Sequence, residues 1–438
     1  MKNSGFLGDL IASILDRGTI FSGVSDDREV EQLCSELLSN KGEVSSRRIG
    51  SAILTRYQQM DDASRLSFFQ FLNTQMDIDV EAVGTAAQAY GEDRSAANLA
   101  ALSDAAEAPR QELLRRLNHV PGATSALVEM RKDLLNLLPT HPDLKRLDLD
   151  FSHLFTSWFN RGFLVNRPIS WHSPANILAK IIQYEAVHAI QDWDDLRRRL
   201  QPDDRRCFAF FHPSMPDEPL VFVEVALCRG IPRSVQDVLH DERSELDRND
   251  VDTAVFYSIS NCQEGLRGIS FGNFLIKQVV ADLSVELPQL KTFVTLSPLP
   301  GLVRWLKGGD SPVSAEFVAS LDDPQTLEAN NDHLRSLAAK YLLTAKRQDG
   351  LPLDPVARFH LSNGAAVHEL HALADISANG LKNAFGVMVN YLYDIPKVES
   401  QHEAFVHTGD VIASKSVAQL ANAKIPAPMQ RIVEKEES

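Results

Sequence analysis

A serine, Ser297, stands where the local sequence could present its hydroxyl to a ligand. It follows Thr295 and Leu296, which read as the end of a strand, and precedes Pro298. Proline cannot donate to a strand ladder, so the strand is predicted to stop at Ser297 and to leave the hydroxyl at the carboxyl edge of a sheet. An isolated Ser-Pro pair more often only caps a turn, so this motif alone leaves both interpretations open.

A histidine, His360, ends a short apolar stretch that begins at Val356 and runs into Asn363-Gly364, a pair typical of a tight turn. Imidazole is the side chain most readily tuned to exchange a proton near neutral pH. The chain contains 13 histidines, so a structural role is the more frequent outcome for any one of them. Position alone does not single out His360.

A glycine-containing segment, residues 266–275, lies between a predicted strand and a predicted helix. Glycines there would let consecutive backbone N–H groups face a ligand, and the helix N-terminus would add positive charge, which suits a pyrophosphate. An ordinary strand-to-helix turn is the alternative. The candidate binding residues are Arg267, Gly268, Ile269, Ser270, Phe271, Gly272 and Asn273.

The histidines His368 and His371 resemble a zinc-binding pair at first sight. Zinc-binding helices of this type place their histidines four residues apart, and position 372 is an alanine. No metal site is therefore predicted.

The composition limits the classes of function. The chain has 438 residues, with 44 Lys and Arg against 59 Asp and Glu, which gives a net charge of −15. Such an acidic balance argues against nucleic-acid binding, which depends on neutralising phosphates. The four cysteines Cys34, Cys207, Cys228 and Cys262 show no Cys-x-x-Cys spacing, which fits a reducing compartment.

No targeting or membrane segment is recognisable. The first 21 residues lack the basic start and uninterrupted apolar core of a secretory signal. The chain contains no run of about 18 apolar residues that could span a membrane. The last three residues differ from a Ser-Lys-Leu peroxisomal address. We expect a cytoplasmic protein that does not bind membranes.

Two domains are predicted from a change in periodicity. Residues 28–138 carry apolar side chains at helical spacing throughout, until two prolines at 139 and 142 disfavour further helix. We expect this helical region to end near the prolines and an aromatic connection to cover residues 151–163. The predicted domains are 1–157, a helical bundle, and 158–438, a mixed α/β domain.

The second domain alternates strands and helices. A helix is expected after Ser173-Pro174, a hairpin from residues 207–211 and 219–228, a strand at 253–260, a helix at 274–287 and a strand at 292–296. Helices are expected again at 314–345, and a short one after residue 416. The fold class is therefore α+β.

Six segments, taken together and in order, resemble the malonyl-CoA decarboxylase family: residues 256–260, 264–268 running into 274–277, 296–301, 359–365, 374–377 and 388–391. Residues 171–174 and 185–188 extend the resemblance upstream. It implies an N-terminal helical bundle used for self-association, as a dimer or tetramer, followed by a GNAT-type acetyltransferase-like catalytic domain.

Motif by motif, the resemblance implies that Ser297 and His360 are the active-site pair and that residues 267–273 bind CoA. Ser270 stands where some relatives carry an acid, so a role of that acid does not transfer. Ser258, Asn363 and Tyr393 are possible pocket residues.

The implied reaction converts malonyl-CoA to acetyl-CoA and CO2, with no cofactor beyond the CoA moiety of the substrate. Ser297 would position the malonyl group and His360 would protonate the enolate carbon. An acyl-CoA-dependent N-acyltransferase is the alternative, since it would share the fold and the glycine loop. A non-catalytic CoA-binding protein is the third. A requirement for an amine acceptor would favour the N-acyltransferase. Binding of CoA without turnover would favour the non-catalytic protein.

Overall fold

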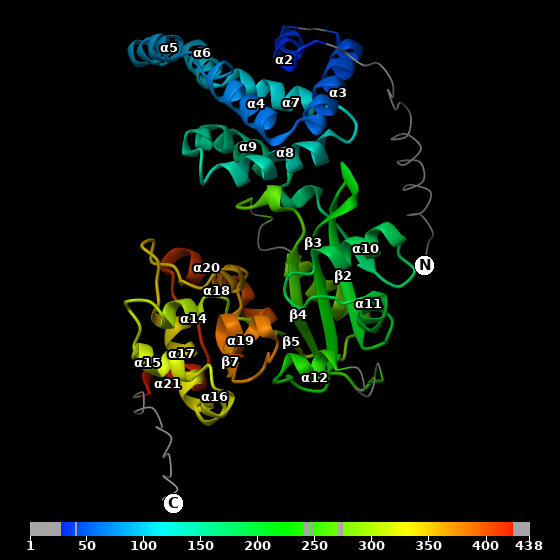
Figure 1. Cartoon of the computed structure of the whole chain (residues 1–438), viewed down its shortest axis with the longest axis vertical. Coiled ribbons are helices and arrows are strands. Elements are labelled where there is room, and N and C mark those ends of the chain that lie inside the picture. The colour runs from blue at the N-terminus through cyan, green and yellow to red at the C-terminus, as the bar shows by residue number, and fades with distance from the viewer. Residues whose placement is uncertain are drawn as a thin grey trace, which may run out of the picture. The chain divides into compact units, whose positions relative to one another are not determined.

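The computed structural model describes residues 28–39, 42–240, 246–247, 249–269, 271 and 275–423. The chain forms two compact units (Figure 1). The first comprises Met1–Leu164, His212–Glu218 and Gln263–Ser270, and the second Val165–Phe211, Pro219–Cys262 and Phe271–Ser438. The N-terminal segment of the first 21 residues and the predicted charged end of the chain lie outside the described residues.

The first unit is helical, as predicted. Its helices are α2 (Val30–Ser39), α3 (Glu43–Gln59), α4 (Asp62–Thr74), α5 (Val80–Glu92), α6 (Ala96–Ala106), α7 (Pro109–Leu117), α8 (Ala123–Leu137) and α9 (Lys145–Trp158), with short 3-10 turns η1 (Pro142–Leu144), η2 (Arg161–Phe163) and η3 (Glu264–Leu266). Asp61, Asp79 and Ser95 cap three of these helices by accepting backbone N–H bonds. Leu33, Phe69, Leu113 and Leu134 belong to the buried core.

The helical region does not end near the two prolines. Helix α8 stops at Leu137, but Pro142 opens the 3-10 turn η1 and α9 follows directly. Proline is tolerated at the first position of a helical turn, where its missing N–H would have no partner anyway. The segment 151–163, expected to be a connection, is therefore helical as far as Trp158.

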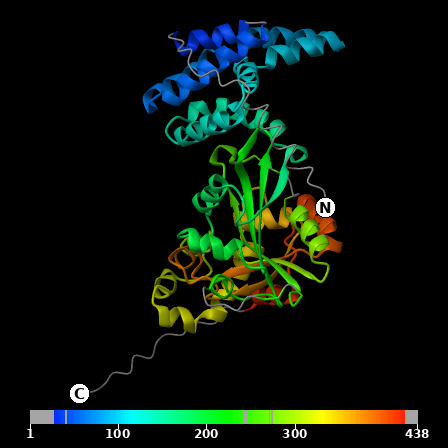
Figure 2. The same cartoon turned by 90° about the vertical axis from the view of Figure 1, so that its right-hand side faces the viewer.

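The second unit is built on a mixed sheet (Figures 1 and 2). Its strands are β1 (Val165–Ile169), β2 (Arg205–His212), β3 (Met215–Cys228), β4 (Thr253–Asn261), β5 (Thr292–Thr295), β6 (Ser297–Pro298), β7 (Ala366–His371) and β8 (Met388–Leu392). The turn Pro213-Ser214 joins β2 to β3, which confirms the predicted hairpin. Strands β4 and β5 are parallel, and β8 runs antiparallel to β5, β6 and β7.

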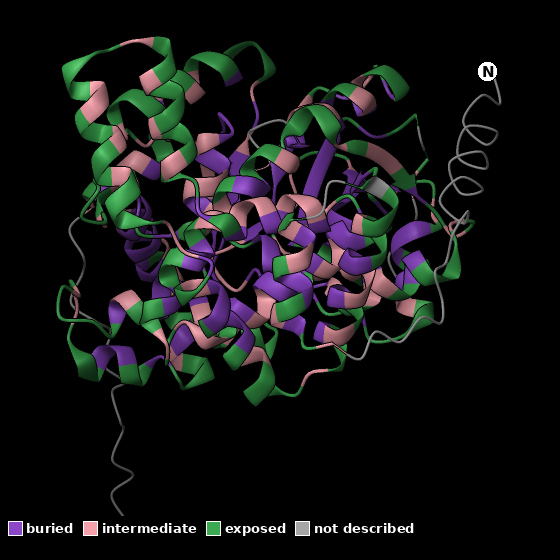
Figure 3. Ribbon diagram, turned by 90° about the horizontal axis from the view of Figure 1, so that it is seen from above, coloured by how far each residue is buried: buried purple, intermediate pink, exposed green. Residues whose placement is uncertain are grey.

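Helices flank this sheet and close its core. They are α10 (Ala175–Tyr184), α11 (Trp193–Leu200), α12 (Val235–Leu239), α13 (Leu275–Glu286), α14 (Leu302–Leu306), α15 (Ala315–Ser320), α16 (Pro324–Ala329), α17 (Asn331–Thr344), α18 (Pro355–Ser362), α19 (Ala378–Ala384), α20 (Val398–Thr408) and α21 (Lys415–Asn422), with the turn η4 (Ile395–Lys397). Ile177, Ile181 and Leu196 pack on Phe211 and Phe222 of the sheet. Buried residues, purple in Figure 3, concentrate on the strands and on the helix faces toward them.

The α+β class, a helical region followed by a mixed α/β unit, is confirmed. The parallel pair β4 and β5 with α13 between them in sequence is the strand–loop–helix–strand order that the residue pattern predicted. No helix in the described part of the chain is long and apolar enough to cross a membrane.

Two local differences concern the candidate residues. Strand β5 ends at Thr295, and Ser297 with Pro298 forms the separate short strand β6, paired with Val389 and Met388. His360 lies on helix α18. A stretch of eight residues is too short for periodicity to identify a helix reliably.

Candidate active site

Ser297 and His360 meet in the second unit, although 63 residues separate them in the sequence. The Ser297 Oγ lies 3.2 Å from the His360 Nε2, within hydrogen-bond distance. Both residues are buried, with 5% and 2% of their surfaces exposed. Such contact between a hydroxyl and an imidazole allows proton exchange between the two groups.

The serine is held by its strand neighbours. Its hydroxyl donates its one proton to the Thr295 Oγ1 at 2.8 Å. The Thr295 carbonyl accepts a hydrogen bond from the Asn390 Nδ2 at 2.7 Å, and the Thr295 hydroxyl accepts the Tyr391 N–H at 3.1 Å. Side-chain bonds thus replace the strand pairing that is interrupted between β5 and β6, and they fix Ser297 against β8.

The histidine ring is held on three sides. Its Nδ1 lies 2.8 Å from the Tyr393 hydroxyl. The ring stacks on Tyr391, with centroids 4.5 Å apart and an interplanar angle of 23°. Phe359 meets it edge-on at 5.1 Å. With one nitrogen on Tyr393 and the other on Ser297, the imidazole has a single orientation.

Asp354 joins the histidine helix to the serine loop. Its carboxylate caps α18 by accepting the N–H groups of Val356 and Ala357, each at 2.9 Å. It also accepts the Tyr341 hydroxyl at 3.2 Å and the backbone N–H of Gly301, four residues after Ser297. Burial raises the pKa of Asp354, and these donors oppose that rise.

Gly301 is required by a close approach. A Cβ on this residue would lie 2.1 Å from the Tyr341 hydroxyl oxygen. Tyr341 is itself buried and cannot move aside. The serine loop and helix α18 are therefore packed against a common tyrosine.

Burial sets the protonation state of the histidine. It lowers the pKa of His360 to about 3, because the charged imidazolium loses its hydration. Burial also raises the pKa of Tyr393 well above its ordinary value. At neutral pH the free site thus holds a neutral imidazole, with one N–H and one acceptor nitrogen, beside a neutral phenol and a neutral serine.

The glycine loop is described only in part, because Ser270, Gly272 and Asn273 lie outside the described residues. Arg267 and Gly268 are exposed, Gly268 has a φ of +82°, and Ile269 is buried. Phe271 is partly buried. The role of this loop in CoA binding stays a prediction.

The start of the loop is fastened within the first unit. The buried Arg131 of α8 donates to the carbonyls of Gly265 and Arg267 at 2.8 and 3.0 Å, and it pairs with Asp148 at 2.9 Å. A Cβ on Gly265 would lie 1.9 Å from the Val128 carbonyl oxygen, so only glycine fits there.

The three possible pocket residues have different partners. Tyr393 contacts His360, as described above. Asn363 caps the end of α18, donating to the Phe359 carbonyl at 2.7 Å. Ser258 donates to the Glu185 carboxylate at 2.7 Å. The structure therefore brings only Tyr393 of these three into hydrogen-bond contact with the serine–histidine pair.

His371 lies on strand β7, and its Nε2 bonds to the Asn390 Oδ1. It thereby orients the amide that holds Thr295. Among the residues that the structure describes, no three His, Cys, Asp or Glu side chains are grouped so as to hold a metal ion. All four cysteines are free thiols.

Sequence reasoning missed the supporting residues Thr295, Asp354 and Tyr391. Asp354 carried a usable signal, since Asp-Pro marks a helix start with proline at the first helical position. Tyr391 belongs to one of the segments that carried the resemblance. Thr295 had no signal, because its role depends on β8, almost a hundred residues further on.

Two family profiles match the chain. The malonyl-CoA decarboxylase N-terminal domain matches residues 77–159, and the malonyl-CoA decarboxylase C-terminal domain matches residues 162–431. Mitochondrial malonyl-CoA decarboxylase of Anser anser anser is 35% identical over 343 residues, which cover 70% of this chain and 68% of that protein. The mouse protein is 34% identical over 349 residues, 70% of each chain.

Solved structures agree with these matches. The crystal structure of malonyl-CoA decarboxylase from Rhodopseudomonas palustris is 48% identical, with a TM-score of 0.85, and covers 91% of this chain and all of that one. The corresponding structure from Agrobacterium vitis is 50% identical, with a TM-score of 0.85 and coverage of 90% and 100%.

Proposed function

The chain belongs to the malonyl-CoA decarboxylase family of enzymes, and from this we infer that it converts malonyl-CoA into acetyl-CoA and CO2. The single observation that supports a mechanism is the contact between Ser297 and His360, 3.2 Å apart in a buried site. The cytoplasmic location expected from the sequence is part of this proposal.

The reaction breaks the bond between the α-carbon and the carboxylate. The electron pair stays on the α-carbon and delocalises onto the thioester oxygen as an enolate, while CO2 leaves. The thioester itself accepts this charge, so the proposal needs no cofactor beyond the CoA moiety. The protein must then place donors near the developing oxyanion and deliver a proton to carbon.

We assign Ser297 to positioning the malonyl group through its hydroxyl. Thr295 and His360 hold that hydroxyl in place, so little reorganisation is needed when the substrate binds. Residues 267–273 would bind the pyrophosphate of CoA, with Gly268 already in a conformation that suits glycine.

We assign His360 to protonating the α-carbon. Its lowered pKa means that the free site holds it neutral. A malonyl carboxylate entering this buried site would favour the imidazolium, since an opposite charge at close range raises the pKa of a histidine. The negative charge then moves from the carboxylate to the enolate, and proton transfer to carbon leaves both partners neutral. Solvent restores the proton in the next turnover.

Tyr393 would position the imidazole. Its hydroxyl bonds to the Nδ1, which directs the Nε2 toward Ser297 and the substrate. This is the relation of a ring-orienting group to a catalytic histidine.

The test follows acetyl-CoA and CO2 by mass spectrometry when the purified full chain is incubated with malonyl-CoA and no amine. We expect stoichiometric acetyl-CoA and CO2, with kcat lowered at least about 10²-fold in Ser297→Ala and in His360→Asn. Ser284→Ala and His407→Asn serve as matched controls, because the Ser284 hydroxyl donates to the Val280 carbonyl of its own helix and His407 is exposed on α20.

Intact malonyl-CoA would contradict the proposed reaction and favour acyl transfer to an amine, or binding alone. Normal turnover by Ser297→Ala would overturn the assignment of the serine while leaving the reaction in place.

A further inference from the structure

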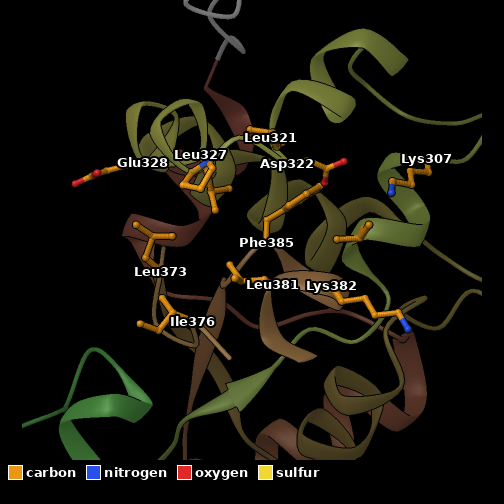
Figure 4. A pocket seen from close by; sticks show the side chains of 12 residues that line it. Lys307, Leu321, Asp322, Leu327, Glu328, Leu373, Ile376, Leu381, Lys382 and Phe385 are labelled. Atoms are coloured by element: carbon orange, nitrogen blue, oxygen red, sulfur yellow. The ribbon is translucent and has the colours of Figure 1, made fainter. Parts of the chain in front are cut away.

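Two adjoining pockets lie in the second unit. One, of about 460 Å³, is bounded by α14, α16, α19 and the turn after β7 (Figure 4). The other, of about 540 Å³, shares Val303, Lys307 and Lys382 with it. Neither is lined by Ser297 or His360. We call the pair the α14–α19 pocket.

The larger part of the wall in Figure 4 is aliphatic. Leu321, Leu327, Leu373, Ile376 and Leu381 line it, with Phe385 at the centre. Ile376 is 58% exposed, so an apolar side chain stands at the mouth. The volume lies in the range of small-molecule sites. An aliphatic lining suits a hydrocarbon chain better than a nucleotide base, whose polar edge would need partners.

The backbone of this wall is strained. Leu373 and Phe385 have φ angles of 51° and 49°, and in the described part of the chain no other non-glycine residue has a positive φ. A bulky residue in this conformation is destabilising, because its Cβ approaches the following carbonyl oxygen. Both residues line the same pocket, and strain of this kind concentrates at ligand sites.

A group of cations borders the aliphatic part. Arg304, Lys307 and Lys382 all line the adjoining pocket and are exposed. None of the three has an ion pair with a carboxylate in the ranges that the structure describes. In Figure 4 Glu328 points away from Lys307 and Lys382, so Asp322 is the acid of this lining on their side. The chain as a whole has a net charge of −15, but these three grouped cations attract an anion locally.

We propose that the α14–α19 pocket binds an amphipathic anion, with a hydrocarbon chain between Leu327, Ile376 and Phe385 and an anionic head on Arg304, Lys307 and Lys382. The head can be the carboxylate of a fatty acid or the phosphates of a long-chain acyl-CoA. Both present the same chemistry, an alkyl chain ending in negative charge.

The pocket bears on the active site through one hairpin. Residues 372–387 connect β7 to β8 and include Leu373, Ile376 and Phe385. Strand β8 pairs with Ser297 through Val389 and carries Tyr391, which stacks on His360. A ligand in the pocket therefore contacts the hairpin that holds the proposed catalytic pair.

The test measures binding by isothermal titration calorimetry with the full chain, using dodecanoate and dodecanoyl-CoA as separate probes and CoA and 1-dodecanol as controls. We expect dodecanoate to bind one site, and 1-dodecanol to bind at least tenfold more weakly because it lacks the charge. Tighter binding of dodecanoyl-CoA than of CoA, retained with malonyl-CoA present, would identify the phosphate-headed source.

Two variants locate the site. Lys307→Glu/Lys382→Glu reverses the charge at the two lysine positions. Ile376→Glu places a charge at the mouth of the pocket without disturbing the core. Each variant should bind dodecanoate at least tenfold more weakly than the wild type. The matched controls are Lys415→Glu, an exposed lysine of α21, and Val406→Glu, whose 59% exposure equals that of Ile376 within one per cent. Absence of binding by both probes, or binding that neither pocket variant weakens, would overturn the proposal.

Discussion

At the scale of single residues, the feature with the largest physical consequence is a buried, neutral histidine. His360 is 2% exposed and no carboxylate lies against its ring nitrogens, which contact Ser297 and Tyr393. The fold therefore gains nothing from protonating it, and burial lowers its pKa to about 3. The unfolded chain, by contrast, protonates histidine near pH 6.5.

This difference predicts a loss of stability in acid. Between pH 6.5 and 3 the unfolded state binds a proton at His360 that the folded state does not, so the free energy of unfolding falls as the pH falls. From pH 7 to pH 5 the contribution is about 2 kcal/mol. Urea unfolding at both pH values should show that the wild type loses this much more stability than His360→Asn. An equal fall in the free energy of unfolding of the wild type and of His360→Asn would contradict this prediction.

At the scale of elements, the active-site candidates depend on how the β6–α14 loop packs against α17 and α18. Tyr341 of α17 contacts Asp354 at the start of α18, and Gly301 leaves room for the Tyr341 hydroxyl. Asp354 in turn holds the Gly301 N–H. Three segments thus share one buried hydrogen-bonded junction.

A substitution pair can test this junction. Gly301→Ala should destabilise the protein by about 1–3 kcal/mol, because its Cβ would overlap the Tyr341 oxygen and overpacking costs that much. Tyr341→Phe removes that oxygen and leaves the next contact at 3.2 Å. In urea unfolding, the loss of unfolding free energy in the double variant should be smaller than the sum of the losses in the two single variants by about 1 kcal/mol. Strict additivity would mean that the overlap is relieved elsewhere.

At the scale of the whole molecule, one helical hairpin of the first unit lacks a core of its own. Helices α5 and α6 pack on each other, and neither contains a buried residue. Val80 and Leu99 are 72% and 48% exposed. Apolar helices with nothing covering them are typical of association surfaces. We propose that this hairpin contributes to the self-association that the family resemblance implied.

Light scattering after size-exclusion chromatography can test that proposal. We expect the wild type to elute as a dimer or tetramer and Val80→Glu/Leu99→Glu to lower the mass, because charges would have to be desolvated in the interface. Val44→Glu, at a residue 75% exposed on α3, is the control. An unchanged assembly in the double variant would place the interface elsewhere.

The sequence by itself determined many of the elements, although helices α9 and α18 were not predicted. Helical periodicity over residues 28–138 and the hairpin around Pro213 are local patterns, and local patterns depend on backbone geometry that each segment carries with it. The strand end beside Ser297 was predicted wrongly, because β5 already ends at Thr295 and Pro298 itself pairs with Met388 in the short strand β6. The segment order also carried the family resemblance.

Only the tertiary structure decided which side chains meet. Nothing local distinguishes His360 from the other histidines, or Tyr393 from Ser258 and Asn363, because the contacts of His360 with Ser297 and Tyr393 join residues 63 and 33 positions apart. The ring of His360 contacts Ser297 of β6 and Tyr391 of β8 only because the fold places α18 beside both residues. The strained turn at Leu373 and Phe385 was likewise invisible, since sequence preference reserves positive φ for glycine and only packing can impose it on larger residues.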